Sequence, residues 1–204
     1  MGGRKVWASG DILTAADVND YLMDQSVMVF AGTAARASAI ASPSEGMVTY
    51  RSDDNVVEAY TGAAWQSIGG KILQVVRATD SSSRTTTSTS FVDASISVTI
   101  TPQKSSSAVM LIWACSANPD LDRRMTLQIT DNSNVAISGA QSHEVGKATA
   151  SGGQVYPVTL IAYATPATTS AVTYKGRFAT VAGGTATLNN SGSTGQLFAI
   201  EVAA

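Results

Sequence analysis

Few residues of this 204-residue chain are of the types that carry out catalysis, and they are scattered along it. Hydrolysis by a side-chain nucleophile needs a neighbouring base, and His143 is the only histidine. It lies in GAQSHEVGK, among turn residues, which favours a structural or solvent-exposed role. Cys115 is the only cysteine and lies in the apolar run VMLIWACSA. It can form no internal disulfide, and we expect it to pack as a small apolar group.

Acidic residues and glycines suggest two further kinds of site, a calcium loop and a phosphate loop. Asp120 and Asp122 lie beside Arg123-Arg124, but the ladder of oxygen ligands of an EF-hand is missing. We expect a solvated turn with local ion pairs there. The glycines of residues 183–195 lack the strand-to-helix context and the following Lys-Ser/Thr of a phosphate loop. The sequence therefore predicts no catalytic residue, no metal site and no cofactor, and we do not expect an enzyme.

Composition and charge argue against several other classes of function. Charged residues make up 14% of the chain, below the roughly 25% of an ordinary soluble domain. The net charge is -2 and the 13 Lys and Arg residues form no cluster, so no nucleic acid is expected as a partner. The longest apolar run, Ala108 to Cys115, is far shorter than the ~20 residues that span a bilayer. The first residues also lack the apolar run of a signal peptide, so we expect no membrane insertion and synthesis in a cytoplasm.

A helix is predicted near the N-terminus, because Ser9 to Phe30 has the strongest helical pattern in the chain. Thr14 is a good N-cap and Asp17 completes a capping box, so the helix is expected to begin there. A helix of ~15 residues is marginal alone. Its apolar side must be covered, either by its own domain or by copies of itself in a short parallel bundle, in which Gln25 would set register and oligomer number. The candidate assembly or anchoring seam is Val18, Leu22, Gln25 and Val29, at steps of three and four.

A small β-meander and then a domain boundary are expected after this helix. Strands are predicted at Met47 to Arg51, Val56 to Tyr60 and Ala64 to Ile68, and the Ala-rich residues 31–41 allow either a short helix or close backbone packing. A sheet this small must cover a helix or a neighbouring subunit. Gly69-Gly70 is a natural hinge, and the residues before it are acidic while those after it are mildly basic. We therefore expect two domains, residues 1–70 and 71–204.

Residues 71–204 alternate between strand and turn patterns. The spacing of about nine strands is that of an antiparallel sandwich. The run DSSSRTTTSTS is interpreted as a solvated loop in preference to an edge strand. The predicted fold class is mainly β, with a short N-terminal helix and small β-meander followed by an antiparallel jelly-roll-like β-sandwich. The predicted strands are 71–79, 91–101, 108–117, 124–130, 134–138, 154–163, 171–181, 185–188 and 196–202.

Two stretches of the chain resemble parts of tailed-bacteriophage virion proteins. LTAADVNDYLMDQSVMVFAGTAAR and SPSEGMVTYRSDDNVVEAYTGAAWQSI resemble the N-terminal module of proteins labelled minor tail, tail-fibre or head-fibre proteins, with matching parts at residues 14–22, 30–36, 43–46 and 60–65. VRATDSSSRTTTSTSFVDASISVTITPQKSSSAVMLIWA resembles the C-terminal domains of phage fibre and appendage proteins, which are commonly trimeric with a jelly-roll-type fold. "TYK" at 173–175 and "GQLFAIEV" at 195–202 continue this likeness.

The resemblance implies a structural component of a phage particle. Residues 1–70 would dock onto the virion and residues 71–204 would be displayed outward. The implied partners are two further copies in a homotrimer, other virion proteins, and a host-surface glycan or protein. A minor tail or tail-fibre protein and a head-fibre or capsid decoration protein both fit, and the seam could face symmetry copies or the particle.

Two function classes without a virion also remain open. A carbohydrate-binding module of a secreted protein predicts an exposed aromatic platform. A glycan-degrading enzyme predicts paired acids in a cleft. Trp113 lies in an apolar strand, where burial in the core is the stronger expectation.

Overall fold

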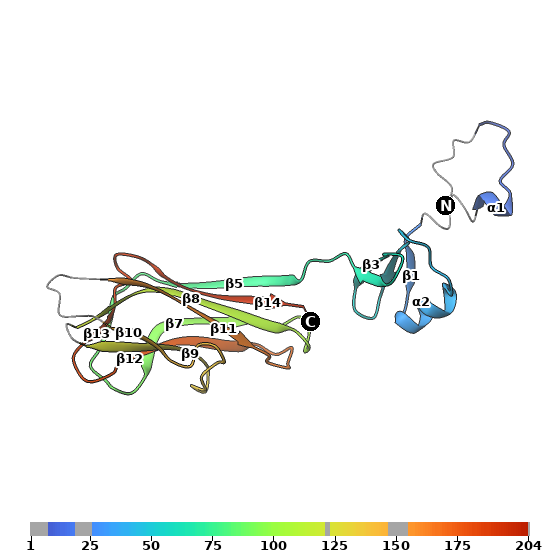
Figure 1. The fold of residues 1–204 in the computed structure, drawn as a ribbon. Helices are drawn as coiled ribbons and strands as arrows, with labels where there is room; N and C mark the ends of the chain where they lie inside the picture. Colours follow the sequence, from blue (N-terminus) through green and yellow to red (C-terminus); the bar gives the residue numbers. More distant parts are fainter. Residues whose placement is uncertain (1–7, 19–25, 121–122, 147–154, 204) are drawn as a thin grey trace. The chain divides into compact units, whose positions relative to one another are not determined.

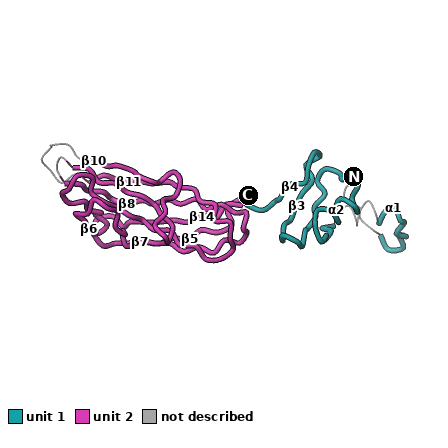
Figure 2. Tube along the Cα trace, turned by 90° about the horizontal axis from the view of Figure 1, so that it is seen from below, with its two compact units in different colours: residues 1–70 teal, residues 71–204 magenta. Residues whose placement is uncertain are grey.

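The computed structural model describes residues 8–18, 26–120, 123–146 and 155–203, and it confirms the mainly-β class (Figure 1). The chain divides into two compact units, Met1–Gly70 and Lys71–Ala204, which we call the small unit and the large unit (Figure 2). This division falls at Gly69-Gly70, the boundary expected from the sequence. Among the described residues, no helix has the length and apolar character needed to cross a membrane.

Helix α1, Ala15–Val18, begins where the capping pattern predicted. The Thr14 hydroxyl oxygen accepts the Asp17 backbone N–H at 3.2 Å. In return, the Asp17 carboxylate accepts the Thr14 backbone N–H at 3.2 Å and the Thr14 hydroxyl at 2.6 Å. A cap of this kind contributes about 1 kcal/mol to a helix.

The prediction that this helix continues to Val29 is wrong, because Met28–Phe30 form strand β1. β1 pairs in parallel with β2, Val48–Arg51, with Val29 opposite Tyr50. β-branched and aromatic side chains favour this extended conformation, and the ladder satisfies their backbone groups. Of the predicted seam, Val18 lies in α1, Val29 lies in β1, and Leu22 and Gln25 lie outside the described residues.

The predicted meander forms, as β2, β3 (Val56–Tyr60) and β4 (Trp65–Ser67). With β1 it makes a four-stranded sheet in the order β1-β2-β3-β4. The β2–β3 turn places Asn55 at φ 56°, a conformation that asparagine tolerates better than most residues. Between β1 and β2 the chain forms helix α2, Thr33–Ala39, which decides the Ala-rich stretch in favour of a short helix.

Charged side chains hold α2 against this sheet. Arg36 of α2 is buried, forms an ion pair with Glu58 of β3, and lies 4.6 Å from the ring centroid of Trp65. Arg51 Nε lies 3.1 Å from the same Glu58 carboxylate. Burial lowers the pKa of Arg36, and the charge of Arg51 lowers it further. Glu58 therefore supplies the negative charge on which two guanidinium groups depend.

The large unit is a sandwich of two sheets in jelly-roll order. One sheet runs β5-β14-β8-β11, and the C-terminal end of β8 also pairs with β13, which in turn pairs with β6. The other sheet runs β7-β12-β9-β10. Their order places each early strand beside a late one, which confirms the predicted jelly roll. The strands are β5 Ile72–Asp80, β6 Arg84–Thr86, β7 Val92–Ile100, β8 Ala108–Pro119, β9 Arg124–Asp131, β10 His143–Gly146, β11 Tyr156–Ala164, β12 Val172–Thr180, β13 Ala186–Leu188 and β14 Gly195–Val202.

The core of the sandwich is apolar and closely packed. Trp113 and Phe178 are among its largest fully buried side chains, so Trp113 is a core residue as expected. The Trp113 ring packs on Gly176 of β12 so closely that a Cβ there would meet ring carbons at 2.9 Å. Cys115 is also buried in the core, and burial raises the pKa of its thiol to about 12. The thiol therefore stays protonated and packs as an apolar group, as predicted.

Three local predictions in the large unit are wrong. Residues 134–138 do not form a strand, because Asn134 adopts φ 68° in a turn and only Ala136 makes an isolated bridge, to Thr130. The Thr/Ser-rich run is not entirely a loop, because β6 lies within it and pairs with β13. His143, placed among turns by the sequence, begins β10, which pairs with β9. The first difference is due to a local turn, whereas the other two depend on a partner strand elsewhere in the chain.

Candidate functional site

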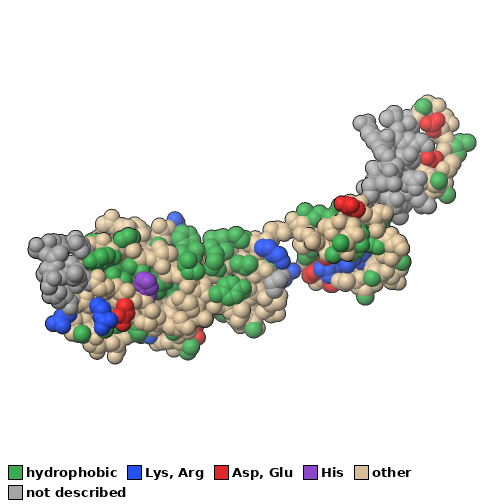
Figure 3. Space-filling model, in the orientation of Figure 1, with side chains coloured by type: hydrophobic (Ala, Val, Ile, Leu, Met, Phe, Trp, Pro, Cys, Tyr) green, Lys and Arg blue, Asp and Glu red, His purple; other side chains and the backbone are tan. Residues whose placement is uncertain are grey.

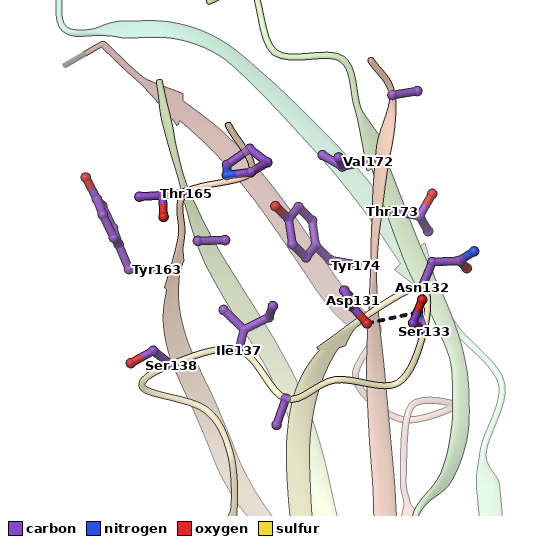
Figure 4. Close-up of a pocket in the computed structure, with 14 residues that line it drawn as sticks. Asp131, Asn132, Ser133, Ile137, Ser138, Tyr163, Thr165, Val172, Thr173 and Tyr174 are labelled. Atoms are coloured by element: carbon purple, nitrogen blue, oxygen red, sulfur yellow. Dashed lines mark hydrogen bonds between the residues drawn. The ribbon is translucent and has the colours of Figure 1, made fainter. Parts of the chain in front are cut away.

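A pocket of about 510 Å³ opens on the large unit, and Figure 4 shows the side chains that line it. It is formed by the loop that follows β9, the C-terminal end of β11 and the start of β12. The pocket lies near the end of the sandwich where β5 begins. Strand register shows this, because Tyr163 of the pocket lies in one cross-strand row with Met110, Ile200 and Val75 of β5. Its volume lies within the roughly 300–1,000 Å³ typical of small-molecule sites.

Tyr174 of β12 and Asp131 of β9 lie opposite each other on neighbouring strands, and both line the pocket (Figure 4). Tyr174 is buried, and burial raises the pKa of its phenol, with a further contribution from the charge of Asp131. The phenol therefore remains protonated well above neutral pH and can act as a hydrogen-bond donor. The pocket lining thus includes a phenol that can donate and a carboxylate that can accept hydrogen bonds.

Asp131 is held in place by the turn that overturned the strand prediction at 134–138. Its Oδ1 accepts the backbone N–H groups of Ser133 and Val135, both at 2.8 Å. These bonds fix the carboxylate and shape the wall formed by residues 131–138. The polar rim of the pocket is therefore set by a short-range turn and not by a strand.

The remaining lining combines an exposed aromatic with aliphatic side chains. Tyr163 is 55% exposed and projects from β11, while Ile137 and Val172 lie nearer Tyr174 (Figure 4). Thr165 adds a hydroxyl group between the two tyrosines in this view. An aromatic ring with hydroxyl, amide and carboxylate groups around it suits a polar ligand that has one apolar face, such as a sugar.

The residues that line the pocket include one carboxylate and not the pair that most glycosidases use. Retaining and inverting glycosidases use two carboxyl groups that flank the scissile bond. Among the residues that line this pocket, Asp131 is the single carboxylate. The arrangement fits binding better than glycan cleavage.

The other residues considered as candidates for catalysis or metal binding do not line this pocket. His143 is exposed on β10. The Asp120 carboxylate accepts the Thr185 backbone N–H at 2.6 Å, and Arg124 forms its ion pair with Glu144 of the adjacent strand. Asp120 and Arg124 thus make contacts with other strands, and the prediction of local ion pairs stays open because Asp122 lies outside the described residues. Within the described ranges, no group of three His, Cys, Asp or Glu side chains is placed to hold a metal ion.

The small unit has a second feature of interest, an apolar sheet face. Val29 of the predicted seam is 68% exposed, and it lies in register with Tyr50 and then with Val57, so these side chains share one face. Ile68, whose N–H donates to the Val57 carbonyl, is also exposed. We call Val29, Val57 and Ile68 the open face of the small unit. Val29, which was predicted to lie in a helical seam, is therefore exposed on the surface of a sheet.

Comparison with models of protein families finds no match to this chain, and comparison with curated proteins finds none either. Neither the pocket nor the open face was predicted from the sequence. From Val158 to Tyr163 the residues are apolar on both sides of the strand except at Thr159, and this pattern indicates an apolar outer surface on this strand. The approach of Asp131 to Tyr174 had no such signal, because 42 positions separate them in sequence.

Proposed function

We propose that the protein is a structural component of a tailed-bacteriophage particle, a minor tail or tail-fibre protein that forms a homotrimer. Residues 1–70 anchor it to the virion, and residues 71–204 are displayed outward. It works without a catalytic site, it is made in the host cytoplasm, and it resides in the virion. The resemblance of both stretches to phage proteins gives this proposal its class.

The observation that carries the proposal is the division of the chain into a small unit with an open apolar face and a separate jelly roll. Val29, Val57 and Ile68 are exposed on a unit whose buried residues, among those described, are all polar. A surface of this kind suits attachment to a larger assembly. The large unit closes its own core and can be displayed independently.

Immunogold labelling of particles of the phage that encodes the chain tests this function. We expect label at the tail of wild-type particles. The double variant Val29→Asp with Val57→Asp should show at least about a tenfold loss of incorporated protein, because charges on the open face oppose docking. Ser67→Asp, at an exposed position in β4, is the matched control and should incorporate normally. Label on the head would instead support a head-fibre or capsid decoration protein, and unlabelled particles would overturn the virion role.

A carbohydrate-binding module on a secreted protein is the second candidate. The pocket favours it, because Tyr163 supplies the exposed aromatic that such a module requires. A virion protein could use the same pocket to contact a host-surface glycan. Glycan binding by the full chain together with unlabelled particles would favour the secreted module.

A further inference from the structure

The pocket continues the interior of the sandwich at the end where the core stops. On β9, Asp131 follows Leu127 and Ile129 in alternate positions, and both of these are core residues. On β12, Tyr174 alternates in the same way with the core residue Phe178. Because alternate residues of a strand point to the same face of a sheet, Asp131 and Tyr174 point toward the space between the two sheets. A cavity of about 510 Å³ opens at this place instead of further apolar packing.

The buried Tyr174 side chain ends in a hydroxyl group that is open to the pocket. Tyr174 is 3% exposed, and its hydroxyl forms no hydrogen bond with another described residue. The hydroxyl oxygen is not among the side-chain atoms that are fully enclosed without a partner, so it reaches the surface of the pocket. Figure 4 shows it directed toward Thr165. Because buried polar groups nearly always have a partner, this hydroxyl is a contact point for a ligand.

Asp131 offers a fixed hydrogen-bond acceptor in the same pocket. Its Oδ1 is held by the backbone N–H groups of Ser133 and Val135, whereas its Oδ2 forms no hydrogen bond with another described residue. The turn therefore orients the carboxylate before a ligand binds, so little further ordering is needed. A hydroxyl or ammonium group of a ligand can donate to this carboxylate without breaking the turn.

The lining of the pocket carries negative charge and no positive charge. Asp131 is its single carboxylate, and its described residues include no Lys, Arg or His. Lys175 and Arg177 alternate with Tyr174 on β12 and form ion pairs with Asp93 on the outer side of the sheet. Charged side chains are also sparse on the face of the large unit that Figure 3 shows. An acidic ligand would therefore meet a carboxylate and find no cation in the pocket to pair with it.

We propose that this pocket binds a sugar unit that has free hydroxyl or amino groups and no acid group. Tyr174 donates to an oxygen of the sugar, and Asp131 accepts from a hydroxyl or ammonium group. Ile137 and Val172 give the lining an apolar part that suits the C–H groups of the ring, and Tyr163 exposes an aromatic ring at the margin. The use of this binding, contact with a host-surface glycan, rests on the proposed function, whereas the charge selectivity rests on the lining.

An array of immobilised neutral, amino-bearing and acidic glycans, probed with the full chain, tests the proposal. Amino-bearing glycans should bind most strongly, neutral glycans less strongly and acidic glycans at least about tenfold more weakly than amino-bearing ones, because of the Asp131 charge. Calorimetric titration with the glycan that binds most strongly then compares variants of the full chain in solution.

Tyr174→Phe removes only the hydroxyl group. Affinity should fall about three- to tenfold, the effect of one hydrogen bond, while the urea midpoint stays unchanged because this hydroxyl has no partner in the described protein. Asp131→Asn keeps a side-chain oxygen for the N–H groups of Ser133 and Val135 and should abolish the preference for amino-bearing over neutral glycans. Asp93→Asn removes a carboxylate that does not line the pocket, and this matched control should keep the wild-type affinity.

Three results would overturn the proposal. They are preferential binding of acidic glycans, no binding of any neutral or amino-bearing glycan on the array, and a fall of the urea midpoint in Tyr174→Phe that accounts for its lost affinity. These measurements use the purified chain and do not depend on particle labelling. Glycan binding with unlabelled particles therefore refutes the virion role alone, and labelled particles without glycan binding refute the sugar pocket alone.

Discussion

The small and large units have interiors of opposite chemistry, although antiparallel strand pairs make up most of both. Among the described residues of the small unit, the buried ones are Arg36, Thr49 and Glu58, all of them polar. In the large unit a continuous apolar cluster lies between the sheets, with Trp113 and Phe178 at its centre. The small unit thus depends on directional contacts, whereas the large unit depends on packing.

This difference follows from size and from where the apolar side chains lie. A unit of a few tens of residues buries too little surface to fold on hydrophobic burial alone. Its apolar residues Val29 and Val57 lie outside, on the open face, while a charged pair holds helix and sheet together inside. A buried ion pair gives little net stability but selects one arrangement of its elements. An apolar surface with a polar interior is what a docking module would need.

The largest expected effect is from breaking the charged interior of the small unit. Glu58→Ala leaves Arg36 buried without its carboxylate and removes one partner of Arg51, which should destabilise the small unit by about 3–5 kcal/mol. Hydrogen exchange of the β2 and β3 amides in the full chain measures this loss. Amides of β8 should be unaffected, because the large unit has its own core.

Arg36→Met combined with Glu58→Leu is the matched control for this prediction. It replaces the ion pair with apolar groups, so protection of β2 and β3 should return toward the wild-type level. Glu58→Ala with unchanged exchange would show that the charged pair does not hold the small unit, and the contrast between the two interiors would fail.

A smaller effect is expected from overfilling the core of the large unit. Gly176→Ala places a methyl group 2.9 Å from the Trp113 ring, which the packed core cannot easily move, so the large unit should lose about 1–3 kcal/mol. Urea unfolding followed by tryptophan fluorescence measures it. Gly192→Ala, where the nearest neighbouring atom is 3.9 Å from the new Cβ, should leave the midpoint unchanged. Equal midpoints for the two variants would mean that the core is loosely packed.

The smallest expected effect is that of acid pH on the stability of the large unit. It tests how much the carboxylates of Asp80 and Glu201 contribute to a unit that depends mainly on apolar packing. Hydrogen bonds from Arg84 lower the pKa of Asp80, against the effect of burial. Burial alone would raise the pKa of Glu201, but hydrogen bonds from Gln74 and from the backbone N–H groups of Gln103 and Lys104 lower it overall. A lowered folded-state pKa contributes stability above the unfolded value of about 4, and this stability is lost as pH falls through the folded value.

The free energy of unfolding of the large unit should therefore fall below about pH 4. Glu201→Gln should give a shallower fall, because one carboxylate that binds protons on unfolding is removed. Urea midpoints between pH 3 and pH 7 measure both slopes. A steeper acid dependence in Glu201→Gln would contradict the prediction.

Sequence patterns predicted most of the strands because those patterns are local. The alternation of Val92 to Ile100 and of Gly195 to Val202 identified half-buried strands near their observed bounds. The Thr14 and Asp17 capping box located the start of α1 for the same reason. The prediction of helix at Val29 is wrong. A spacing of three and four residues carries no information on strand pairing, and Val29 lies in β1, which pairs in parallel with β2.

The sequence by itself determined the mainly-β class, the division at Gly69-Gly70, and the burial of Trp113 and Cys115. Only the tertiary structure decided that Arg36 and Glu58 meet, that Asp131 lies opposite Tyr174, and that Val29 and Val57 share one sheet face. The physical reason is that hydrophobic alternation and capping act within a few residues, whereas register joins strands that are far apart in the chain. The pocket and the open face both depend on that long-range register.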